Sequence, residues 1–84
     1  MVLVKLVSRL AKNVGAEEIS ISASSFTELL KELSKLIPDL LSEKGVPSQR
    51  YIILVNDRDY RVYEGEIELK NSDTVIIIPV IHGG

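Results

Sequence analysis

The stretch Thr74-Val75-Ile76-Ile77-Ile78-Pro79-Val80 decides the fold of this 84-residue chain. From Val75 onward the run is apolar at odd and at even positions, so neither face of the predicted strand is polar. A strand that is apolar on both faces is typical of a central position in a sheet. We therefore predict that residues 74–80 form a central strand, and the remaining elements are placed around it.

The N-terminal part of the chain is predicted to form an antiparallel pair of strands. Apolar side chains recur at every second position of residues 2–8, and residues 19–22 alternate apolar with polar side chains, as a half-exposed strand does. Residues 9–15 are expected to be the connection between them. Gly15 supplies the backbone freedom that a reversal of direction requires.

A helix follows, and its start and its buried face are both marked in the sequence. Ser25 and Glu28 fit the S-x-x-E capping box, in which a hydroxyl and a carboxylate satisfy free backbone N–H groups. The residues at the i, i+3, i+4, i+7 spacing of one buried face are Phe26, Leu29, Leu30, Leu33, Leu36 and Ile37. Pro38 disfavours helical geometry just before it, so the helix should end or kink there. Residues 39–44 are expected to add a short helical turn, which Gly45 stops.

The second half of the chain has the pattern of strands and turns. Residues 51–55 are aromatic and β-branched, which predicts a strand. Residues 56–59 form a turn cluster, and residues 60–63 are expected to be a short edge strand. Residues 64–69 are expected to be a loop with one or two apolar anchors, followed by a turn at residues 71–73.

This order of elements predicts an α+β fold of the β-grasp type. One main helix can cover only one face of a mixed sheet of four to five strands. We expect residues 1–80 to form a single domain and residues 81–84 to be a flexible C-terminal Gly-Gly tail.

Composition excludes several classes of function. The absence of Cys excludes a disulfide scaffold, a thiol nucleophile and Cys-ligated metal, and a single His excludes any site that needs two imidazoles. With 10 basic and 12 acidic residues the formal net charge is −2, which argues against unassisted binding to nucleic acid. No targeting signal and no apolar run of roughly 20 residues is present, so a cytoplasmic protein without a membrane contact is expected. These features point away from an autonomous enzyme.

The pair Gly83-Gly84 follows the predicted central strand almost directly. Because glycines lack a Cβ atom, they can thread a narrow channel and adopt φ values that other residues avoid. An enzyme elsewhere could activate a carboxylate presented in this way, which would make the protein a substrate. A structureless tail is the alternative interpretation.

Three segments of the chain resemble MoaD proteins, the small subunits of molybdopterin synthase. These segments are residues 4–11, residues 55–57 and residues 69–84. MoaD, ThiS and the ubiquitin-related modifiers share a ubiquitin-like β-grasp fold and a terminal Gly-Gly. The ending His82-Gly83-Gly84 is more similar to the ubiquitin-related modifier of tRNA thiolation, because MoaD proteins tend to carry a small residue before the glycines.

The resemblance implies a reaction at Gly84. In this family a ubiquitin-activating-type, MoeB-like enzyme uses ATP and Mg²⁺ to adenylate the terminal carboxylate, which sulfur transfer then converts to a thiocarboxylate. The chain would itself bind no cofactor and would donate sulfur in molybdopterin biosynthesis, with a MoaE-like large subunit as its partner. The alternative is a modifier that serves a tRNA-thiolation enzyme or is joined to lysines of target proteins. A third hypothesis is a plain interaction domain whose Gly-Gly end is inert.

His82 and three aspartates are further polar candidates for a site. His82 could steer the tail or carry a proton near the acyl group, or it could contact a partner as an exposed tail residue. Asp57, Asp59 and Asp73 do not follow the spacing of a metal-binding loop. They are expected to be turn residues, and no metal site is predicted.

Strand alternation predicts an apolar face that the helix does not cover. If Val75 and Ile77 point toward the helix, their neighbours point away from it. The residues predicted to face outward and to bind a partner are Ile52, Leu54, Ile76, Ile78, Val80 and Ile81. An exposed apolar patch on a small protein usually marks an interaction site. A reversed parity or a covering loop is the alternative.

Overall fold

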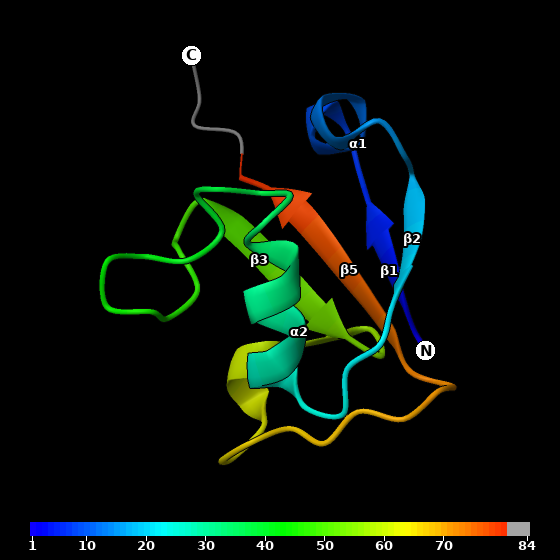
Figure 1. The fold of residues 1–84 in the computed structure, drawn as a ribbon. Helices are drawn as coiled ribbons and strands as arrows, with labels where there is room; N and C mark the ends of the chain where they lie inside the picture. Colours follow the sequence, from blue (N-terminus) through cyan, green and yellow to red (C-terminus); the bar gives the residue numbers. More distant parts are fainter. Residues whose placement is uncertain (81–84) are drawn as a thin grey trace.

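The computed structural model describes residues 1–80, which form a sheet packed against helices (Figure 1). In chain order the elements are β1 (Val2–Leu6), α1 (Arg9–Val14), β2 (Glu18–Ile21), α2 (Phe26–Leu33), β3 (Tyr51–Val55), β4 (Arg58–Asp59), the 3₁₀ helix η1 (Tyr60–Val62) and β5 (Thr74–Pro79). Within residues 1–80 the sheet has five strands in the order β2-β1-β5-β3-β4. The predicted central position of the last strand is therefore confirmed.

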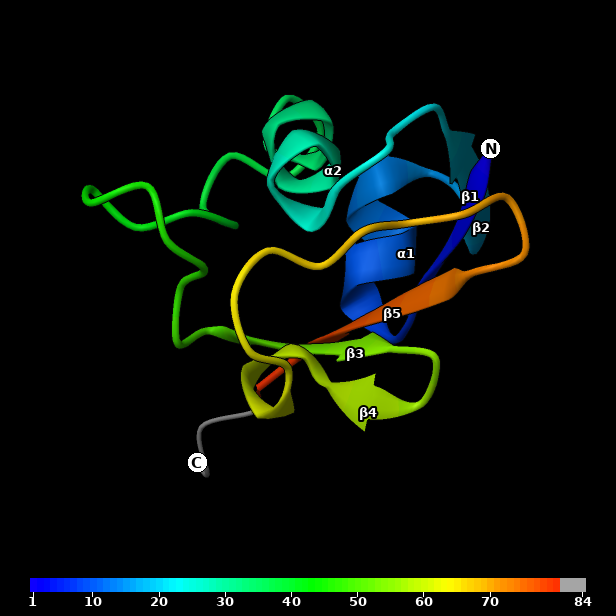
Figure 2. The same cartoon turned by 90° about the horizontal axis from the view of Figure 1, so that it is seen from below.

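The sheet is mixed, as predicted. β1 pairs antiparallel with β2 and parallel with β5, and β3 pairs antiparallel with both β5 and β4. Because β1 and β5 are parallel neighbours, their C-terminal ends lie at the same edge of the sheet. Figure 2 shows α2 lying on one side of the sheet. The predicted β-grasp fold with one main helix is confirmed.

The core forms between α2 and the inner face of the sheet. Leu29 and Leu33 of α2 are fully buried, as are Ile53 of β3 and Val75 and Ile77 of β5. Each such side chain contributes roughly 1.5–3 kcal/mol through its removal from water. A domain this small, with no Cys, depends on this apolar contact for its stability.

The N-terminus of α2 has the hydroxyl half of the predicted capping box and an additional clamp from a distant loop, while the Glu28 carboxylate accepts from the Ser24 hydroxyl at 3.4 Å. The Ser25 hydroxyl accepts a hydrogen bond from the Glu28 N–H at 3.2 Å. The N–H and hydroxyl of Thr27 donate to the two carboxylate oxygens of Glu66 at 2.9 and 2.7 Å. These bonds, first that from the Thr27 N–H, hold the pKa of Glu66 below its usual value. The loop of residues 64–69 is thereby attached to the helix, and Leu69 is its buried anchor.

The end of α2 and the segment after it differ from prediction. The helix ends at Leu33, and Leu36 is 50% exposed, although Ile37 is buried. Pro38 disfavours the helical conformation at Ile37, so the regular helix ends before this residue and residues 34–36 form turns. The helical turn expected at residues 39–44 is absent from the structure, which describes this segment as turns and a bridge.

Two other short segments also differ from prediction. Residues 9–15 contain the helix α1 rather than a plain connection, with Leu10 buried and Gly15 in the left-handed conformation at φ 89°. The edge strand expected at residues 60–63 lies earlier in the chain, as the two-residue β4 within the predicted turn, and η1 occupies residues 60–62. Asn56 and Asp57 have positive φ values of 51° and 69°, which is typical of a two-residue hairpin turn, so β4 pairs with β3 at once.

The start of β5 is tied to the β3–β4 hairpin by two side chains. The Asn56 amide donates to Asp73 Oδ1 at 3.0 Å, and its carbonyl oxygen accepts from the Thr74 N–H at 3.0 Å. Asp73 Oδ2 accepts from the Lys70 N–H at 2.8 Å. The bonds from Lys70 and then from Asn56 lower the pKa of Asp73. Asp73 is thus a turn residue, as predicted, and it fixes where β5 begins.

We expect Asp73→Asn to reduce the acid sensitivity of folding. Because the folded-state pKa of Asp73 is depressed, its carboxylate stabilises the fold fully above its unfolded pKa of about 3.9. That contribution is lost as the pH falls through the folded-state pKa. The free energy of unfolding in urea should therefore fall less between about pH 7 and about pH 3 in the variant than in the wild type.

Asp57→Asn is the control for this experiment. It removes one carboxylate from the neighbouring hairpin, where the Asp57 side chain forms no hydrogen bond with other residues of the described part of the chain. An acid sensitivity of Asp73→Asn equal to that of the wild type would contradict the role of Asp73.

Candidate functional site

The sheet face opposite to α2 carries the apolar residues that were predicted to face outward. Along β5, Val75 and Ile77 are buried, while Ile76 and Ile78 are only partly covered. On β3, Ile52 is 39% exposed. The structure thus places these side chains on the outer face, and their binding to a partner stays a prediction.

The register of β3 and β5 brings these residues together. Ile52 lies opposite Ile78, and Leu54 lies opposite Ile76. The Val80 N–H donates to the Arg50 carbonyl at 2.8 Å, which continues the pairing beyond β5. The outer apolar face consists of Ile52, Leu54, Ile76, Ile78 and Val80.

Four of the predicted site residues lie outside the described residues. They are Ile81, His82, Gly83 and Gly84. The predictions for the tail, for the acyl chemistry at its end and for its histidine therefore stay predictions. Val80 is the last described residue, and it lies at the edge of the sheet where β1 and β5 both end.

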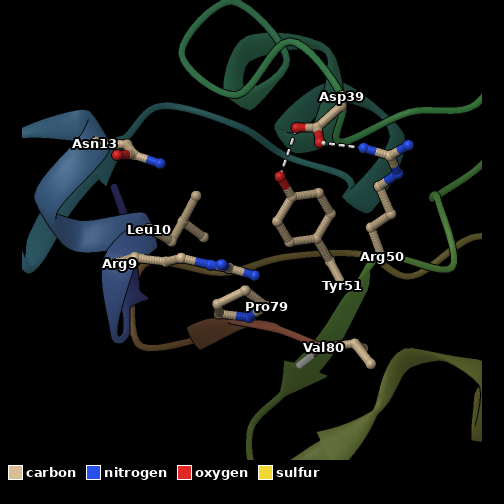
Figure 3. A pocket seen from close by; sticks show the side chains of 8 residues that line it. All are labelled: Arg9, Leu10, Asn13, Asp39, Arg50, Tyr51, Pro79 and Val80. Atoms are coloured by element: carbon tan, nitrogen blue, oxygen red, sulfur yellow. Dashed lines mark hydrogen bonds and ion pairs between the residues drawn. The ribbon is translucent and has the colours of Figure 1, made fainter. Parts of the chain in front are cut away.

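A polar pocket of about 440 Å³ lies at this edge (Figure 3). On one side α1 supplies Arg9, Leu10 and Asn13, and on the other Tyr51 of β3 stands beside Asp39 and Arg50. Pro79 and Val80 complete the lining. We call this the strand-end pocket.

Asp39 organises one wall of the strand-end pocket. The Tyr51 hydroxyl donates to Asp39 Oδ1, and Arg50 Nη1 lies 3.5 Å from Asp39 Oδ2. Desolvation by burial, together with the hydrogen bond to Asp39, raises the pKa of Tyr51 to about 12. The tyrosine is therefore a neutral donor at neutral pH, and both carboxylate oxygens of Asp39 are already engaged.

On the opposite wall of the strand-end pocket lies the guanidinium of Arg9, which Asp39 does not bind. Arg9 makes no ion pair within residues 1–80. Asn13 lies one helical turn further along α1 and lines the same pocket. The sequence had placed Arg9 and Asn13 in a connection, and their i, i+4 spacing was the signal that a helix would bring them to one side.

The strand-end pocket has the side chains of a binding site. The strand-end pocket presents guanidinium and amide donors, which suit an anionic group, whereas the single O–H of Tyr51 is already donated to Asp39. The acidic side chains of residues 1–80 do not gather in a group of three that could hold a metal ion. Neither helix in this part of the chain has the length and apolar character that a bilayer span requires.

Comparisons with known proteins agree with one another. The sequence model of the ThiS family matches residues 4–84. The ubiquitin-related modifier 1 of Laccaria bicolor is 37% identical over 57 residues, which are 67% of this chain and 43% of that protein. This chain therefore spans less than half the length of that curated relative.

Solved structures with the same fold cover nearly the whole chain. The small archaeal modifier protein 1 of Methanosarcina acetivorans has a TM-score of 0.81 and 32% identity, covering 99% of this chain and 95% of that one. A chain of the BexX/CysO complex of Amycolatopsis orientalis has a TM-score of 0.81 and 25% identity, with 100% of each chain covered. Urm1 of Sulfolobus solfataricus, with a TM-score of 0.81, 24% identity and coverage of 93% of this chain and 99% of its own, agrees in fold.

Proposed function

The chain belongs to the ThiS family of ubiquitin-like sulfur carriers and modifiers, and from this premise we propose that Gly84 is its reacting residue. The observation that carries the proposal is the family match, which runs through residues 4–84 and so includes Gly83-Gly84. The absence of Cys supports it, because a carried sulfur atom would have to be bonded at the carboxyl group of Gly84.

The proposed reaction has two steps, and both occur at the Gly84 carboxyl group. In the first, a carboxylate oxygen attacks the α-phosphate of ATP on an adenylating enzyme, which forms an acyl-adenylate and releases pyrophosphate. In the second, a sulfide attacks the carbonyl carbon and AMP leaves, so a thiocarboxylate remains. The adenylate supplies the good leaving group that a carboxylate lacks. ATP and Mg²⁺ are bound by the adenylating enzyme.

The described residues contribute a rigid base for this chemistry. β5 is paired along its length with β1 on one side and with β3 on the other. The Val80 N–H is held by the Arg50 carbonyl, so the chain leaves the sheet from a fixed position four residues before Gly84. We propose that the outer apolar face beside Val80 docks the partner enzymes.

The destination of the sulfur has two candidates. One candidate is a modifier that serves tRNA thiolation or is joined to lysines of other proteins. It is favoured by the likeness to ubiquitin-related modifier 1 and to small archaeal modifier protein 1, and by His82 before the glycines. In the modifier branch, a lysine amine attacks the activated carbonyl carbon, AMP leaves and an isopeptide bond forms. The resemblance of residues 4–11 and 69–84 to MoaD proteins favours molybdopterin synthesis with a MoaE-like large subunit.

Intact-mass analysis of the protein purified from its own cells tests the proposal. A mass increase equal to the exchange of one oxygen for sulfur is the expected result for the carrier. For the modifier, tryptic digestion of other cell proteins is expected to yield lysines that carry a branched remnant of residues 71–84, because Lys70 is the last basic residue before Gly83-Gly84. If active cells contain neither species, the Gly-Gly end is inert and the proposal is wrong. Copurification with a MoaE-like subunit or with a tRNA-thiolation enzyme distinguishes the two destinations.

A further inference from the structure

The strand-end pocket is lined by two arginines and by the last described residue, Val80. Arg9 reaches it from α1 and Arg50 from the segment before β3, with Tyr51 between the two arginine side chains (Figure 3). The acyl chemistry at Gly84 assigns no role to either arginine. Their positions at the root of the reactive end of the chain require a separate explanation.

Arg50 has one long, exposed internal ion pair, and Arg9 has none within residues 1–80. Arg50 is 72% exposed and meets Asp39 at 3.5 Å, and an exposed ion pair of this length contributes little to stability. Asp39 also accepts the hydrogen bond of the Tyr51 hydroxyl. Arg9 makes no ion pair with any residue from 1 to 80. Both guanidinium groups are therefore available to an external anion.

The strand-end pocket and the outer apolar face share one residue, Val80. A neighbouring hollow is lined by Val80 and Ile52 together. The combined surface has an apolar centre bordered by positive charge on the side where the chain leaves the sheet. Protein interfaces commonly have an apolar centre and a polar rim, and charges in the rim speed association with the partner.

We propose that Arg9 and Arg50 form a basic rim that docks acidic side chains of the adenylating enzyme, with the outer apolar face as the centre of the contact. The identity of the partner rests on the proposed function. A protein is favoured over a nucleic acid because the whole chain carries a net charge of −2. Binding to a phosphate backbone requires several cations, each of which neutralises a phosphate.

Pyrophosphate exchange with the purified adenylating enzyme of the same cells tests the basic rim. The double variant Arg9→Glu/Arg50→Glu is expected to raise KM about tenfold or more at low ionic strength and to change kcat less than about twofold, because rim charges act on association. The rise should shrink as salt is added. An unchanged KM would overturn the proposal.

Matched variants separate docking from general charge and from folding. Lys12→Glu/Lys70→Glu makes the same change in net charge, but Lys12 lines a different hollow and Lys70 precedes β5, at the far end of that strand. KM should then stay within about twofold of the wild type. Arg9→Gln/Arg50→Gln adds no carboxylate beside Asp39 and should retain the wild-type unfolding midpoint while raising KM about threefold. Equal effects of the arginine and lysine double variants would overturn the proposal.

A probe that does not depend on the enzyme is a hexaglutamate peptide followed by NMR. Peptide binding should shift the side-chain Nε–H signals of Arg9 and Arg50 and the backbone N–H signals of Asn13 and Val80. A hexauridylate that binds at lower concentration than the peptide would assign the pocket to nucleic acid instead. If the wild type supports no pyrophosphate exchange, the proposed function fails, and the peptide titration still decides whether the basic rim binds acidic chains.

Discussion

Replacing Ile77 with aspartate is expected to unfold the protein, whereas the same replacement of its neighbour Ile76 should leave it folded. Ile77 is 0% exposed at the centre of the sheet, and Ile76 is partly covered on the outer face. The variant at residue 77 loses roughly 2–3 kcal/mol of apolar burial. It must also bury a carboxyl group without a partner, which costs several kcal/mol more.

The stability of a domain of this size is too small to absorb that cost. At roughly 0.05–0.15 kcal/mol per residue, 84 residues have a free energy of unfolding of about 4–13 kcal/mol. Far-UV circular dichroism and urea unfolding measure the outcome. We expect Ile76→Asp to keep a cooperative transition and to weaken binding to the adenylating enzyme, since it places a charge in the outer apolar face.

Ile77→Val is the conservative control, with an expected cost of about 1 kcal/mol. A folded Ile77→Asp protein would show that the assignment of faces is wrong. An unfolded Ile76→Asp protein would show that the outer apolar face is part of the core rather than a binding surface.

Replacing Gly84 with alanine is expected to lower adenylation on the order of 100-fold. A Cβ atom at this position obstructs a narrow channel and restricts the φ values that the reacting residue can adopt. Displacement of a reacting carbonyl by about 1 Å costs on the order of 100-fold in rate. The measurement is ATP–pyrophosphate exchange with the adenylating enzyme at saturating concentration of the variant.

Two controls make this experiment specific to the reacting residue. Urea unfolding of Gly84→Ala should match that of the wild type, since the substitution lies outside residues 1–80 that form the sheet and its core. The Arg9→Gln/Arg50→Gln variant is expected to change KM rather than the saturated rate. Exchange by Gly84→Ala at the wild-type rate would remove Gly84 from its proposed role.

The main elements could be predicted because their signals lie within single segments. The capping residues Ser25 and Glu28 precede a helical apolar period, and residues 51–55 and 74–80 carry strand-forming side chains on both parities. The short elements could not be predicted with the same success. The helix α1 has six residues, which are too few to show a helical period of apolar side chains.

The two parts of the candidate site differ in the same way. The outer apolar face follows from alternation along β3 and β5 once Val75 and Ile77 are assumed to face the helix, and Ile52 and Ile76 then belong to it. The sequence left that assumption open, because both parities of the run are apolar. The strand-end pocket could not be predicted, because it joins Arg9, Asp39 and Arg50 from segments that the sequence separates widely. Their meeting depends on α1 forming and on the parallel pairing of β1 with β5.

The sequence by itself therefore determined the central position of residues 74–80, the apolar character of both faces of that strand and the absence of any cysteine thiol. Composition is independent of the fold, and periodicity depends only on residues that are close in the chain, so neither requires the tertiary structure. Which of the two faces packs against α2 was decided by the tertiary structure. The tertiary structure alone decided that Arg9, Arg50 and Val80 line one pocket. That arrangement results from strand register and from packing of α1, which bring distant residues together only when the sheet has formed.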